Sequence, residues 1–166
     1  MSSTIHASEI QFHDNWAQKT DLNSIRVKEA FESPTALENR FILRQMGPLK
    51  GKRILDVGSG LGESSVYFAT LGAEVTAADI SPEMVATAQR LARLHNVSLR
   101  GGASSAEDLN VPEGHFDFVY LANLIHHVPD RRKMFQNIHR ALKPGGKFFS
   151  WDPLAYNPVI KVYRHM

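Results

Sequence analysis

The sequence predicts an α/β protein built on one parallel β-sheet with helices on both faces. Short apolar segments alternate with amphipathic segments after Gly51, and a glycine-rich turn follows the first apolar segment. Right-handed crossovers leave few ways to connect such elements. The 166 residues are enough for one domain with a buried core. We expect a doubly wound sheet of five parallel strands in the order 3-2-1-4-5.

Residues 1–48 come before this alternation and are expected to form helices and the connections between them. One amphipathic helix is predicted over residues 9–20. A second follows the start signal Ser33-Pro34-Thr35 and ends at Gly47-Pro48. Its expected apolar face contains Leu37, Phe41, Ile42 and Met46. We expect residues 1–48 to lie over the mouth of the ligand site as a helical lid, with His13 and Trp16 facing the site.

The predicted core covers residues 49–152 and contains the five strands. Their expected ranges are 53–57, 74–79, 97–100, 116–122 and 147–151. Between them, helices are expected over 63–71, after the Ser81 cap with Pro82 in first position, and over 130–142. A tight turn over 143–146 is expected before the last strand.

The glycine-rich turn Asp56-Val57-Gly58-Ser59-Gly60-Leu61-Gly62-Glu63 stands where open parallel sheets bind ligands. A dinucleotide would bring a pyrophosphate dianion there, and its usual fingerprint is G-x-G-x-x-G. Here the third glycine comes one position early, and Asp56 and Glu63 flank the turn. Because two carboxylates repel a dianion and suit a cation, the turn favours S-adenosylmethionine over NAD.

The second strand is expected to end at Asp79, which comes 21 positions after Gly58. An acid about 20 residues beyond such a turn commonly reaches a ribose diol. A carboxylate can accept from both hydroxyls through charge-assisted hydrogen bonds. Ile80 would then offer an apolar surface to the base.

The stretch from about Leu49 to Trp151 resembles a class I S-adenosylmethionine-dependent methyltransferase. It is most similar to the small-molecule branch that includes quinone-biosynthesis methyltransferases. The resemblance is carried by the segments RILDVGSGLGE, VTAADISPEMVATA, SSAEDLNVPEGHFDFVYLANLIHHV and ALKPGGKFF. It implies a Rossmann-like fold and transfer of a methyl group from S-adenosylmethionine to oxygen, nitrogen or carbon of a small-molecule acceptor.

The resemblance also implies roles for individual residues. The cofactor's methionine end is expected at Asp56, Gly58, Ser59, Gly60 and Asn123, its ribose at Asp79, and its adenine at Ile80, Ser105, Ala106 and Glu107. The family usually has an aspartate where this chain has Ser105. His126 and His127 are candidate bases toward an acceptor hydroxyl, and Trp151 and Tyr156 are candidates for the acceptor pocket. No spacing typical of metal ligands is present in the sequence.

The end of the sequence departs from the family pattern. The family continues after the fifth strand with a helix and a further strand pair, whereas only residues 153–166 remain here. We expect these to be the start of a truncated C-terminal excursion, without the usual last two strands. The fifth strand would then be an exposed edge through which two copies of the chain would pair.

Composition narrows the other possibilities. A net charge of +2 gives little attraction to nucleic acid, and the absence of cysteine excludes disulfides and thiolate chemistry. Neither a signal peptide nor an apolar run of membrane-spanning length is apparent, so a cytoplasmic protein is expected. Two other functions stay open at this point: an NAD-dependent oxidoreductase, and a non-catalytic S-adenosylmethionine-binding module or fragment.

Overall fold

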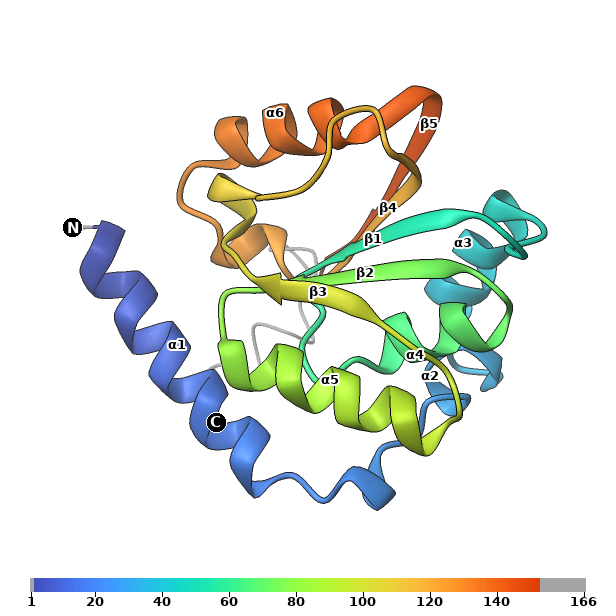
Figure 1. Cartoon of the computed structure of the whole chain (residues 1–166), viewed down its shortest axis with the longest axis horizontal. Coiled ribbons are helices and arrows are strands. Elements are labelled where there is room, and N and C mark those ends of the chain that lie inside the picture. Colours follow the sequence, from blue (N-terminus) through green and yellow to red (C-terminus); the bar gives the residue numbers. More distant parts are fainter. Residues whose placement is uncertain (1, 153–166) are drawn as a thin grey trace.

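The sheet of the computed structural model, which describes residues 2–152, has five parallel strands in the order β3-β2-β1-β4-β5 (Figure 1). The strands are β1 (Arg53–Val57), β2 (Glu74–Asp79), β3 (Arg100–Ala103), β4 (Phe116–Ala122) and β5 (Leu142–Trp151). The predicted strand order is confirmed. Residues 153–166, including Tyr156 and the expected C-terminal excursion, lie outside the described residues.

Helices cover both faces of the sheet (Figure 1). They are α1 (Ser2–Lys19), α2 (Glu29–Glu32), α3 (Leu37–Met46), α4 (Glu63–Thr70), α5 (Pro82–Leu94) and α6 (Arg131–Ala141). Helices α2 to α5 pack on one face, and α6 packs on the other. Among the described residues, no helix is both long enough and apolar enough to cross a lipid bilayer.

Strand β1 shows why the sheet needs both layers. Ile54 belongs to the core under α2 to α5, whereas its neighbour Leu55 belongs to the core under α6, and both are fully buried. Side chains alternate across a strand, so an apolar run must be covered on both sides. Each buried aliphatic side chain of this kind contributes about 1.5–3 kcal/mol.

Helix α5 begins where the sequence predicts. Ser81 is its N-cap and accepts a hydrogen bond from the Met84 amide at 3.0 Å, and Pro82 occupies the first turn. This cap fixes the direction of α5 directly after β2. Its N-terminal end therefore stays next to the carboxyl ends of the strands.

The predicted position of the third strand is wrong. The sequence favours residues 97–100, but β3 spans Arg100–Ala103 and pairs with β2. A Cβ at Gly101 would lie 2.0 Å from the Ala77 carbonyl oxygen. The backbones of β2 and β3 approach each other so closely that glycine pairs at this position. Val97, which has the higher strand propensity, packs beside the core under α5 instead.

The predicted turn over 143–146 is wrong in its bounds. These residues belong to β5, which starts at Leu142, directly after α6 (Figure 1). Phe116 of β4 pairs with Leu142, but Phe118 pairs with Lys147. The extra residues of β5 are accommodated as a bulge, which keeps its last residues in register with β4.

Several apolar side chains are more exposed than their helical spacing suggests. Leu37 and Phe41 of α3 are 64% and 58% exposed, although Ile42 of the same helix is buried. Phe135 of α6 is 43% exposed and meets Phe148 of β5 edge-on. The exposed groups lie near β5, which has no strand partner on its outer side within residues 2–152.

The predicted start of the second helix is also wrong. The Ser33 hydroxyl bonds to the Thr35 amide and hydroxyl, and it does not cap a helix. Helix α3 starts at Leu37, and its N-cap residue, Ala36, has no capping side chain. The short helix α2 comes before this turn and was not expected from the sequence.

Candidate functional site

A cavity of about 610 Å³ opens at the carboxyl ends of β1, β2 and β4. It is lined by every residue expected to bind the cofactor, namely Asp56, Gly58, Ser59, Gly60, Asp79, Ile80, Ser105, Ala106, Glu107 and Asn123. His127, Trp151, His13 and Trp16 also line it, but His126 does not. The parallel sheet thus gathers segments far apart in the sequence at one edge.

The glycine turn combines open space with tight packing. Its three glycines have positive φ, at +70° for Gly58, +53° for Gly60 and +94° for Gly62. A Cβ at Gly62 would lie 2.5 Å from the Ala88 Cβ, whereas a Cβ at Gly60 would meet no atom within 4 Å. Gly62 therefore lets α4 pack against α5, and Gly60 leaves space beside the turn.

Asp79 is held by backbone amides on both sides. Its Oδ1 accepts from the Ser81 amide and its Oδ2 from the Gly60 amide, each at 2.9 Å. The side chain is only 7% exposed, and burial raises the pKa of its carboxyl. Two fixed amides orient the carboxylate and leave each oxygen a further lone pair for a ligand hydroxyl.

Asp56 is the most deeply buried acid of the cavity, at 2% exposure. Its Oδ2 accepts from the Ser65 hydroxyl at 2.6 Å. Burial raises its pKa to about 7, against the opposing effect of that hydrogen bond. Glu63, at the start of α4, also has a pKa raised by burial. Desolvated carboxyls gathered in one cavity favour a ligand that brings positive charge.

The Ser59 hydroxyl in the same turn is buried and has no hydrogen-bond partner among the described residues. A buried hydroxyl without a partner is costly, so it indicates a group that a ligand satisfies. An amino acid moiety would bring an ammonium to the desolvated carboxyls, and its carboxylate would accept a hydrogen bond from the Ser59 hydroxyl. The residues present therefore fit the methionine end of S-adenosylmethionine.

The raised pKa of Asp56 predicts a pH dependence of stability. Between its usual 3.8 and about 7, the folded protein holds a proton that the unfolded chain releases. Stability from this group is therefore greatest at low pH, falls as the pH rises through that window, and levels off above about pH 7. We expect the unaltered protein to lose about 2 kcal/mol relative to Asp56→Asn between pH 5 and pH 8.

The measurement is urea unfolding of both proteins at each pH. Taking the difference between the two proteins cancels the other titrating groups. A pH-independent difference would contradict the expected burial effect.

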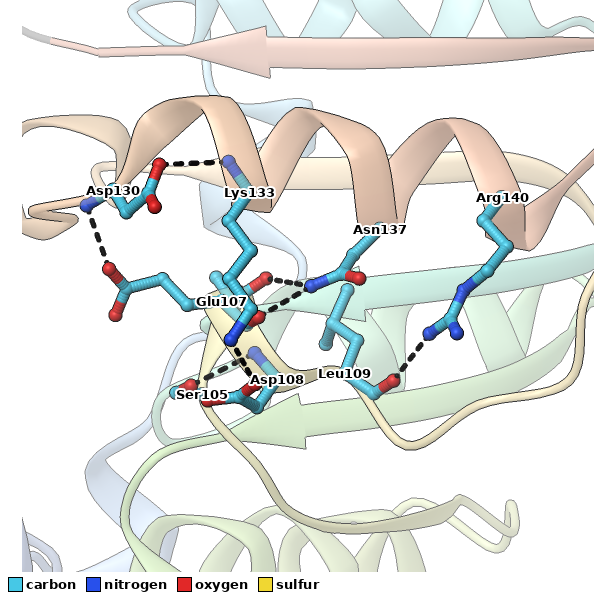
Figure 2. Close-up of polar contacts among 9 residues, drawn as sticks. Ser105, Glu107, Asp108, Leu109, Asp130, Lys133, Asn137 and Arg140 are labelled. Atoms are coloured by element: carbon cyan, nitrogen blue, oxygen red, sulfur yellow. Dashed lines mark hydrogen bonds and ion pairs between the residues drawn. The ribbon is translucent and has the colours of Figure 1, made fainter.

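Ser105, Ala106 and Glu107 line the cavity, and the segment that they begin lies beside α6 (Figure 2). Ser105 caps its short 3-10 turn by accepting from the Asp108 amide at 3.1 Å. The buried Glu107 carboxylate accepts from the Asp130 amide at 2.7 Å, just before α6. The Glu107 side chain thus helps to hold the start of α6.

Helix α1 covers part of the cavity. Glu9, His13 and Trp16 all line it, and Asp14 accepts from the hydroxyl of Ser81, the cap of α5. Ala17 is buried beside Leu61 and Met84. Polar and apolar contacts thus hold α1 on the segments that bear Gly60 and Asp79.

The two adjacent histidines differ in position. His127 lines the cavity, with its Nδ1 3.6 Å from Glu9 Oε1 of α1, and burial lowers its pKa. His126 has its Nδ1 2.6 Å from Asp152 Oδ1. The sequence offered both histidines equally as candidate bases, but only His127 lines the cavity.

The sequence analysis did not find a polar network in the cavity wall. The Tyr120 hydroxyl donates to Asn39 Oδ1 at 2.7 Å and accepts from the Trp151 indole at 3.0 Å. All three residues line the cavity. Asn39 lies on the same face of α3 as the buried Ile42 and Met46. The sequence signal for this network is Asn39, a polar residue at a position of α3 where the helical spacing predicts an apolar one.

Among the side chains that the structure describes, in residues 7–152, no three histidine or acidic groups lie close enough together to hold a metal ion.

Comparison with known proteins places the chain in a family. Residues 55–150 match the family described as "Methyltransferase domain". The chain belongs to this methyltransferase family. The matched region runs from within β1 to within β5 and includes the whole glycine turn from Gly58 to Gly62.

Relatives of this methyltransferase domain agree with the match. A ubiquinone biosynthesis O-methyltransferase of Xanthomonas oryzae is 43% identical over 106 residues, covering 61% of this chain and 43% of the relative. One from Xanthomonas euvesicatoria is 37% identical over 161 residues, covering 90% and 65%. The matches cover 43% and 65% of the length of these two relatives, so the chain spans less than two thirds of each.

A solved structure of an S-adenosylmethionine-dependent methyltransferase from Mesorhizobium loti has 28% identity and a TM-score of 0.61. The match covers 70% of this chain and 53% of that one. The shared fold agrees with the Rossmann-like prediction.

Proposed function

We propose that this methyltransferase domain transfers a methyl group from S-adenosylmethionine to oxygen, nitrogen or carbon of a small molecule. The observation that carries the proposal is the pair of acids that flank the glycine turn and line the cavity, the buried Asp56 and the half-buried Glu63. A pyrophosphate would face both of them, which disfavours NAD as the ligand. The family match and the fit of Ser59 support the same cofactor.

Each part of the cofactor has a matching wall in the cavity. Asp56, Ser59 and the backbone at Gly58 and Gly60 would hold the methionine end, with Asn123 beside it. Asp79 would accept from the ribose hydroxyls. The adenine would lie between Ile80 and the segment of Ser105, Ala106 and Glu107. The cofactor supplies an activated methyl, so the protein's task is alignment and exclusion of water.

The acceptor would lie between the N-terminal helices and the far wall of the cavity. We propose that residues 1–48 act as its lid and residues 49–152 as the cofactor-binding core. Supporting observations are Trp16, Asn39 and Trp151 along that part of the wall. His127 is the stronger candidate base, since its lowered pKa keeps it neutral and able to accept a proton near pH 7. His126 would act only after a change of position.

The names of the relatives suggest the first acceptors to try. Two relatives carry the name ubiquinone biosynthesis O-methyltransferase. We therefore propose hydroxyl oxygen as the first acceptor atom, and hydroxylated aromatic intermediates of ubiquinone biosynthesis as the first compounds.

Calorimetric titration with S-adenosylhomocysteine and with NAD tests the cofactor. We expect binding of the first and none of the second. A tritiated methyl assay with S-adenosylmethionine then tests transfer to candidate acceptors. Binding of NAD alone would overturn the proposal, and cofactor binding without transfer to any acceptor would favour a non-catalytic binding module.

Location and assembly also remain proposals. We propose a cytoplasmic protein without nucleic acid partners and a homodimer formed through β5, which Leu37, Phe41 and Phe135 flank with exposed apolar surface. Sedimentation over a range of concentrations tests the dimer, and a monomer at every concentration would exclude it. Cell fractionation and a nucleic acid binding assay test the other two.

A further inference from the structure

The segment from Ser105 to Leu109 lies beside α6, as Figure 2 shows. Its first three residues line the cavity. Its other side is bonded to α6 at several points, which Figure 2 shows as a row of contacts along the helix. The geometry of such a wall depends on the groups of α6 that bond to it.

Asn137 holds the part of this segment that faces the cavity. Its Nδ2 donates to the carbonyl of Ala106 at 3.2 Å and to the carbonyl of Glu107 at 2.7 Å. In a trans peptide the carbonyl and the N–H point in opposite directions. Holding the Ala106 carbonyl on α6 therefore turns the next amide away from α6. One side chain fixes the direction of two successive peptide groups.

Two other contacts hold the C-terminal end of the segment. Lys133 pairs with Asp108, and Arg140 Nη2 donates to the Leu109 carbonyl at 3.0 Å. Neither Asp108 nor Leu109 lines the cavity. Arg140 is therefore suited as a control for Asn137. It also bonds α6 to a carbonyl of the segment, but that carbonyl belongs to a residue that does not line the cavity.

We propose that Asn137 is a positioning residue that sets the preference of the cavity for adenine over other purines. This inference rests on the proposed function. Adenine offers an acceptor at N1 and an amine donor at N6, whereas hypoxanthine offers a donor and an acceptor at the same two positions. An amide that is held in one direction suits the first pattern only, because it can donate to the N1 acceptor of adenine but not to the N–H that hypoxanthine has at the same position. A segment free to reorient would accept both.

The test compares S-adenosylhomocysteine with S-inosylhomocysteine by calorimetry. We expect the unaltered 166-residue chain to prefer the adenosyl compound. In Asn137→Leu, which removes the donor at similar size, we expect adenosyl affinity to fall about tenfold and the preference to shrink toward equality. Asn137→Gln keeps a donor amide and is expected to recover part of the preference.

Arg140→Leu is the matched control. It is expected to lower the melting temperature by losing a similar bond, yet to keep the adenosyl preference. Should Asn137→Leu fail to fold, Asn137→Ser removes the same contacts with a shorter side chain.

An unchanged preference in the folded Asn137 variant would overturn the inference, as would an equal loss in Arg140→Leu. If the unaltered chain binds neither compound, the proposed function itself fails, and the inference fails with it.

Discussion

Gly62→Ala is expected to destabilise the protein by about 3 kcal/mol. A Cβ at this position would lie 2.5 Å from the Cβ and 2.7 Å from the Cα of Ala88. The φ of +94° adds strain for any residue with a side chain. Overpacking a closed helix contact costs about 1–3 kcal/mol, and the left-handed backbone adds about 1–2 kcal/mol. Helices α4 and α5 would have to separate, which would also move the turn.

Gly60→Ala is the matched control for this prediction. Gly60 also has a positive φ, of +53°, but its Cβ would meet no atom within 4 Å. We therefore expect a loss of only about 1 kcal/mol from backbone strain. Unfolding by urea measures both variants. Equal losses at the two positions would show that the contact between α4 and α5 at Ala88 is not the cause.

Asp79→Asn is expected to weaken binding of S-adenosylhomocysteine about 100-fold. The amide removes the negative charge and places an NH₂ group against the amide N–H of Gly60 or of Ser81. It also weakens two charge-assisted hydrogen bonds to a ribose, each worth about 1.5–3 kcal/mol. Calorimetric titration measures the change.

Asp117→Asn separates loss of binding from loss of folding. The Asp117 carboxylate accepts from the Arg53 amide at 2.8 Å and from Lys143 at 2.9 Å, and the residue does not line the cavity. We expect it to lower the stability of the protein and to leave ligand affinity within about twofold, since its contacts lie far from the ribose. A similar fall in affinity for both variants would mean that Asp79 acts only by supporting the fold.

Much of the fold could be predicted because its central elements are marked locally. Strands β1, β2 and β4 occupy the predicted residues, since buried parallel strands are short apolar runs bounded by turn residues. The cap at Ser81 was equally visible, because capping depends on residues that are neighbours in the chain. The predicted cofactor residues could be placed around one cavity because carboxyl ends of parallel strands share an edge.

The features that could not be predicted depend on contacts between distant segments. Strand β3 includes Gly101, where the backbone of β2 comes too close to leave room for a side chain. The sequence of β3 does not indicate this close approach. The bonds of Tyr120 to Asn39 and Trp151 join β4, α3 and β5. Such networks require the packed sheet before any of the partners meet.

The sequence by itself determined the order of the elements, the methyltransferase likeness and the acids beside the glycine turn, because each is written in neighbouring residues. The tertiary structure decided which of two adjacent histidines reaches the cavity, and that α6 holds the wall at Ala106 through Asn137. The physical reason is that side-chain direction and long-range hydrogen bonds are set only when separate elements pack together.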